Sequence, residues 1–90
     1  MTPGAIVRIR GNDHEAHGHV LAILSPAALP GLEIEHSPHA AEVRNILDHM
    51  GVTQIALIGY SVDNRDVMFA ALQTPNGWFD LHQQPLEIEE

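Results

Sequence analysis

Hydrophobic and polar positions alternate along the chain in short runs, separated by segments that are rich in glycine, proline, asparagine and aspartate. This pattern is typical of β-strands joined by turns. The runs predicted as strands are 5–10, 19–24, 32–35, 53–62, 67–73, 78–82 and 86–88. The segments predicted as turns or loops are 11–18, 25–31, 63–66 and 74–77. The short connections favour a mainly antiparallel sheet.

A single segment shows the periodicity of a helix. Its apolar residues recur at the spacing i, i+3, i+4 and i+7, which places them on one face: Val43, Ile46, Leu47 and Met50. Ser37 is positioned to cap the first turn, and Pro38 suits the first helical position because that position needs no backbone N–H. Gly51 can end the helix in a left-handed conformation. We therefore predict one amphipathic helix over about residues 38–50.

Length and composition predict one α+β domain over residues 1–90. Apolar residues make up 44% of the chain, with one tryptophan, one tyrosine and two phenylalanines, so we expect a core of isoleucine, leucine, valine and alanine. The absence of cysteine excludes disulfides and thiolate metal sites. No apolar run is long enough to span a bilayer, and the first residues lack the pattern of a secretory signal. We expect a cytoplasmic protein without membrane association.

The charge is strongly acidic: twelve acids face four arginines, and there is no lysine. Nucleic-acid binding needs clustered cations, so we expect no direct binding to DNA or RNA. A net charge of −8 instead favours a protein partner with a basic surface. Protonation of all seven histidines would change this charge to −1 (−8 + 7), and histidine side chains ordinarily protonate near pH ~6.5. We therefore also consider association, including homo-oligomers, below that pH.

Three histidines lie close together in the sequence: His14, His17 and His19. His14 and His17 are three residues apart, whereas the zinc-protease motif needs histidines four apart on a helix. His17 and His19 are two apart, so on a strand they would share a face. Imidazole binds zinc and nickel, so a zinc or nickel site is one hypothesis for these residues. The alternative is a solvated polar turn without any cofactor.

Four other residues are candidates for partner binding. Trp78 and Asp80 share one face of the predicted strand 78–82, and tryptophan is enriched at binding hot spots; packing of Trp78 in the core is the alternative. Glu33 and Glu35 alternate onto one face of the predicted strand 32–35. No catalytic motif is complete in the sequence, so we expect the protein not to be an enzyme.

Three stretches resemble SH3-like small β-barrels of bacterial and phage accessory proteins. "PGAIVRIRG" (3–11) is similar to the first strand of such barrels and "GHVLAIL" (18–24) to the second. "GWFDLHQQPLEIEE" (77–90) is similar to an aromatic hairpin strand followed by a barrel-closing strand. The resemblance implies a small, partly open barrel that binds a protein or a nucleic acid, and the low cation count favours a protein.

Taken together, these patterns predict a small acidic, non-catalytic protein-interaction module. It would act as an inhibitor, adaptor or assembly component of a phage or mobile element, and would dock on a protein or self-associate through a sheet edge. The alternative function is a histidine-based metal-binding protein.

Overall fold

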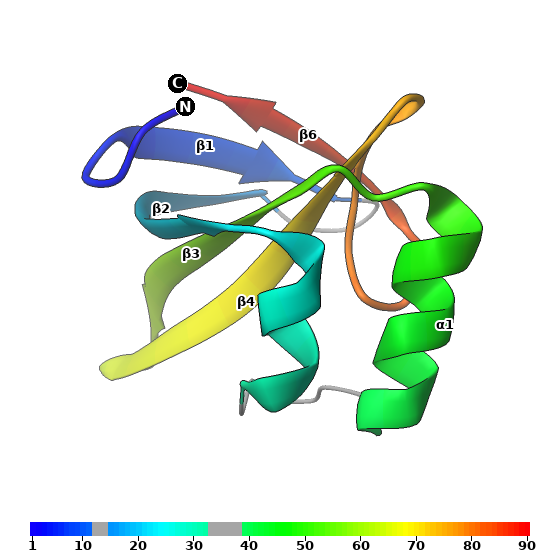
Figure 1. Cartoon of the computed structure of the whole chain (residues 1–90). Coiled ribbons are helices and arrows are strands. Elements are labelled where there is room, and N and C mark those ends of the chain that lie inside the picture. Colours follow the sequence, from blue (N-terminus) through cyan, green and yellow to red (C-terminus); the bar gives the residue numbers. More distant parts are fainter. Residues whose placement is uncertain (12–14, 33–38) are drawn as a thin grey trace.

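The computed structural model describes residues 1–11, 15–32 and 39–90, in which six antiparallel strands form a closed barrel (Figure 1). The strands are β1 (Ile6–Arg10), β2 (Glu15–Leu24), β3 (Gln54–Val62), β4 (Arg65–Thr74), β5 (Gly77–Phe79) and β6 (Pro85–Glu89). Neighbours in sequence pair with each other, and β6 pairs with β1 to complete the ring. The 3₁₀-helix η1 (Pro26–Gly31) and the α-helix α1 (Ala40–Met50) lie side by side against the barrel. The predicted α+β class with a mainly antiparallel sheet and one amphipathic helix is confirmed.

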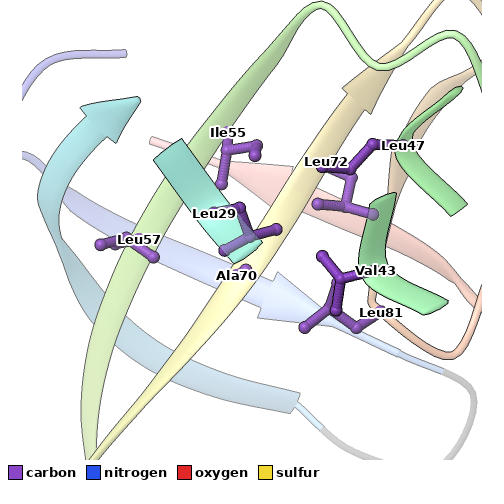
Figure 2. Close-up of a cluster of buried hydrophobic side chains, with 8 residues drawn as sticks. All are labelled: Leu29, Val43, Leu47, Ile55, Leu57, Ala70, Leu72 and Leu81. Carbon is purple, nitrogen blue, oxygen red and sulfur yellow. The ribbon is translucent and has the colours of Figure 1, made fainter. Parts of the chain in front are cut away.

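Strands β3 and β4 are buried on both faces, which gives the protein two apolar clusters. The interior cluster fills the barrel and contains Val7, Ile9, Val20, Ala56, Ile58 and Ala71. The helix-side cluster lies between the outside of the barrel and the two helices, and it contains Leu29, Val43, Leu47, Ile55, Leu57, Ala70, Leu72 and Leu81 (Figure 2). Burial on both faces explains why residues 55–59 are uniformly apolar or small instead of alternating.

Helix α1 packs the predicted apolar stripe against the barrel. Val43 and Leu47 are buried in the helix-side cluster, and Ile46 and Met50 pack at its margin. Gly51 ends the helix with φ of 66°, as predicted, because this left-handed conformation carries little steric cost for glycine.

The start of α1 differs from the prediction. The helix begins at Ala40, and His39 occupies the N-cap position without a capping bond from its side chain. Ser37 and Pro38, which the sequence predicts for the cap and the first turn, lie outside the described residues, as does most of the predicted strand 32–35.

Two segments predicted as irregular are regular. Strand β2 begins at Glu15, because residues 15–18 pair with residues 7–10 of β1. The prediction of a turn throughout 11–18 was therefore wrong from Glu15 onward. The predicted loop 25–31 contains η1, which begins at Pro26 and buries Leu29 in the helix-side cluster.

Strand β5 is shorter than the predicted strand 78–82. It ends at Phe79 because Asp80 forms a turn: its Oδ1 accepts hydrogen bonds from the backbone N–H of His82 (2.8 Å) and of Gln84 (3.0 Å). The chain then returns as β6, where Pro85 pairs opposite Phe79. This shortness of β5 leaves most of β4 with a strand neighbour on one side alone among the described residues.

Candidate interaction surface

A β-bulge in β2 re-aims the side chains of that strand. Val20 lies opposite Ile58 and Ala22 lies opposite Leu57, so Leu21 is an extra residue without a partner in β3. Leu21 is 43% exposed, whereas Val20 before it belongs to the interior cluster. Bulges bend a strand and commonly re-orient side chains next to functional sites. Here the bulge places a leucine on the outer face of the sheet.

The outer face carries a further exposed apolar side chain, on the other side of His19 from Leu21. Ile6 is 67% exposed and lies opposite His19, which in turn lies opposite Gly59. A Cβ atom on Gly59 would lie 3.2 Å from Cδ1 of Leu21 and 3.3 Å from Cε1 of His19. The missing side chain at Gly59 therefore lets both side chains lie over β3. We call Ile6, His19 and Leu21 the outer patch.

The outer patch lies on a part of the sheet that the helices leave uncovered. Helices η1 and α1 cover the section of β3 and β4 that includes Ile55, Leu57 and Ala70 (Figure 2). Ile6 and Leu21 belong to neither apolar cluster and remain exposed. An apolar surface of this kind on a small acidic domain is a candidate docking site.

A row of ion pairs borders the outer patch along β1. Arg8 donates a hydrogen bond to Glu89 and lies 3.5 Å from Glu15, while Arg10 lies 3.5 Å from Glu87 and 3.9 Å from Glu15. The hydrogen bond to Glu89, together with the charges of Glu89 and Glu15, raises the pKa of Arg8. The charges of these two arginines and three glutamates sum to −1 (+2 − 3), so the arginines do not create a basic surface.

Trp78 lies in the barrel wall rather than on the outer patch. It is half-buried, pairs opposite Leu86 and Gln73, and packs against the interior cluster. Asp80 is half-buried and organises the turn after β5. Both residues therefore contribute to the fold, and contact of either with a partner stays a prediction.

The remaining candidates divide between described and undescribed parts of the chain. Glu33, Glu35 and His14 lie outside the described residues. His17 and His19 are both exposed on the outer face of β2, His17 opposite Arg8 and His19 opposite Ile6. Within residues 1–11, 15–32 and 39–90, no three histidine or acidic side chains are grouped to hold a metal ion. The hypothesis of a zinc or nickel site at the three histidines stays a prediction.

Sequence reasoning missed the two apolar members of the outer patch. Ile6 belongs to a strand with partial alternation, and Leu21 belongs to a nearly uniform apolar run that gives no sign of exposure. The alternation from Ile6 to Arg10 does mark Ile6, Arg8 and Arg10 as one face, opposite Val7 and Ile9. That signal could have identified Ile6 but not the bulge at Leu21.

No helix in the described part of the chain is long and apolar enough to cross a membrane. Comparisons of the chain with protein-family models, with curated proteins and with solved structures find no match.

Proposed function

We propose that this protein is a small non-catalytic interaction module that docks on another protein through the outer patch. The observation that carries the proposal is the exposure of Ile6 and Leu21 on either side of His19, on a sheet face that the helices do not cover. Burial of one such side chain in an interface contributes about 1.5–3 kcal/mol. Two of them can anchor a specific contact with a small area.

The charge supports a partner with a basic surface. The chain carries −8, and Arg8 and Arg10, which border the patch, are paired with acids. A complementary partner would place apolar residues over Ile6 and Leu21 and basic residues around them, which speeds association and excludes acidic proteins. Within this proposal the barrel is an SH3-like module of a bacterial or phage accessory system, acting in the cytoplasm as an inhibitor, adaptor or assembly component.

The test begins with a photo-cross-linking residue at position 6, and at position 62 as a control, in cells of the source organism. Val62 is a suitable control because it is also apolar and exposed (40%), but it lies near the tip of the β3–β4 hairpin. A protein that cross-links at position 6 but not at position 62 is then purified. Its affinity is measured for the wild type and for the variants Ile6→Ser, Leu21→Ser and Val62→Ser.

We expect each outer-patch substitution to weaken binding about 10- to 100-fold, in line with the free energy of burying one side chain. Val62→Ser should leave the affinity unchanged. Equal losses for all three variants, or no loss for any, would show that the outer patch is not the docking surface.

A further inference from the structure

Strand β4 is far longer than β5, the strand that pairs with it on the side away from β3. It pairs with β3 along nearly its whole length, from Arg65 opposite Val62 to Gln73 opposite Gln54. It pairs with β5 at residues 72–74 alone. Within the described residues, no strand pairs with residues 66–71 on the side away from β3. An edge of this kind is a template for another strand.

The turn between β3 and β4 sets which backbone groups face that edge. Asp63 and Asn64 have φ of 51° and 62°, as in a two-residue type I′ hairpin turn. The flanking residues Val62 and Arg65 lie opposite each other and form a hydrogen-bonded pair in such a turn. Hydrogen-bonded pairs then alternate with pairs whose backbone groups point away from each other. Odd-numbered residues of β4 therefore face β3, and even-numbered residues face the edge.

The other end of the β3–β4 hairpin shows the same alternation of backbone groups. The carbonyl oxygen of Gln73 accepts a hydrogen bond from the N–H of Thr53 (2.9 Å), so an odd-numbered residue again faces β3. The N–H and C=O groups of Asp66 and Met68 consequently point away from β3. No other strand of the described chain reaches them.

The side chains along this edge differ between the two faces of the sheet. On the inner face, Tyr60 and Phe69 form an edge-to-face ring pair with centroids 5.7 Å apart, and Val67 lies beside them opposite Tyr60. All three are half-buried. On the outer face, Asp66 is exposed and accepts a hydrogen bond from Ser61 (2.9 Å).

We propose that the edge of β4 at residues 66–69 binds an extended peptide segment as an added β-strand. The accessible edge ends there, because Ala70 and Ala71 are buried. The peptide carries apolar residues at alternate positions, which face Phe69 and Val67, and a basic residue on the other face near Asp66. Backbone pairing selects an extended chain, and the side chains on the two faces select this alternation. The site goes beyond docking through the outer patch, because it uses backbone groups of a different strand.

Charge argues for a foreign peptide over a second copy of the chain. Each copy carries −8, so two copies repel each other. At the edge itself, the exposed acids Asp63 and Asp66 outnumber the cation Arg65. A basic peptide meets the same acids with favourable charge.

The test uses a phage-displayed library of random 12-residue peptides, selected on the intact protein. The selected peptides are synthesised, and their affinities are measured for the wild type, Asp66→Pro and Asp66→Ala. Proline at position 66 removes the N–H that points to the edge, and edge strands tolerate proline at such positions. Asp66→Ala removes the carboxylate and its bond to Ser61 but keeps the N–H.

We expect peptides with alternating apolar and basic residues, which bind Asp66→Ala somewhat more weakly than wild type. Asp66→Pro should bind the peptides about tenfold more weakly than Asp66→Ala, because proline removes one backbone hydrogen bond and its ring adds steric bulk. Hydrogen exchange of the wild type should slow at the Met68 amide when peptide binds. This measurement needs no variant, so it decides the question even if Asp66→Pro unfolds.

Four results would overturn the proposal. They are failure to select any peptide, equal binding by Asp66→Pro and Asp66→Ala, slowed exchange confined to β1 and β2, and a peptide-free dimer in which the Met68 amide is already protected. Ile6→Ser should bind the peptides like wild type, so a failure of the edge site is distinguishable from a failure of the outer patch.

Discussion

A Cβ atom on Gly18 would lie 2.7 Å from the carbonyl oxygen of Gly59. Real Cβ atoms do not approach other atoms this closely, so β2 and β3 can lie together here because position 18 has no side chain. The same Cβ would lie 2.9 Å from Cγ2 of Ile58, which is fully buried in the interior cluster. Gly18 is therefore part of the barrel wall, although the sequence places it at the end of a turn.

This contact predicts that Gly18→Ala destabilises the fold. Because the obstacle is the backbone of β3, the strands must move apart, and overpacking of this kind costs about 1–3 kcal/mol. Urea denaturation measures the free energy of unfolding. Gly31→Ala is the matched control, since nothing lies within 4 Å of its Cβ position. Equal stability of the two variants would contradict the predicted close approach of β2 and β3.

A second prediction concerns Trp78, which packs against the interior cluster. We expect Trp78→Ala to lower the free energy of unfolding by about 2–3 kcal/mol, less than for a fully buried tryptophan because Trp78 is half-buried. Trp78→Phe should recover most of the loss. If Trp78→Ala leaves stability unchanged but weakens partner binding, Trp78 serves as a partner contact and not as part of the core.

A third prediction concerns how β6 is held against β1. Leu86 and Ile88 pack on the interior cluster, while the ion pairs of Arg8 are exposed to solvent. Ile88→Ala should therefore destabilise the fold by about 1–2 kcal/mol. Arg8→Gln should cause no measurable change, because solvent screens exposed ion pairs. Thermal unfolding of both variants in low and high salt measures the difference, and a larger effect for Arg8→Gln would reverse this ranking.

The raised pKa of Arg8 determines how the stability contributed by Arg8 changes with pH. A cation with a raised folded-state pKa contributes stability that is present below the ordinary arginine value and is lost as pH rises through the folded value. Arg8 therefore adds no slope to stability near neutral pH. Wild type and Arg8→Gln should show parallel stability profiles between about pH 6 and 9. If the two stability profiles diverge within that range, the pKa of Arg8 is not raised as stated.

A fifth prediction is association at mildly acidic pH. Protonation of the seven histidines changes the net charge from −8 to −1 (−8 + 7), which removes most of the repulsion between copies. His19 lies between the exposed Ile6 and the backbone of Gly59, so the outer patch is the surface that we expect to associate. Light scattering from pH 8 down to pH 5 should show an increasing mass for wild type as the pH falls. An unchanged mass across this range rules the idea out.

The sequence by itself determined the features that depend on neighbouring residues. The apolar spacing of Val43 and Leu47, with Gly51 after them, specified α1 because helical periodicity and its end signal are local. Likewise Gly77, with φ of 113°, ends the predicted turn after Pro75. The sequence also indicated that His17 and His19 would share a face if both lay on a strand, but the pairing of β2 with β1 decided that His17 lies on one.

Tertiary structure decided the features that depend on register between distant strands. The exposure of Ile6, the bulge at Leu21 and the need for glycine at position 18 arise where β1, β2 and β3 meet, and no local pattern encodes that pairing. The unpaired edge at Met68 likewise exists because β5, held short by the Asp80 turn, does not reach it. Neither candidate surface could therefore be recognised as a whole from the sequence, although strand alternation marks Ile6, because each depends on strand pairing between residues that lie far apart along the chain.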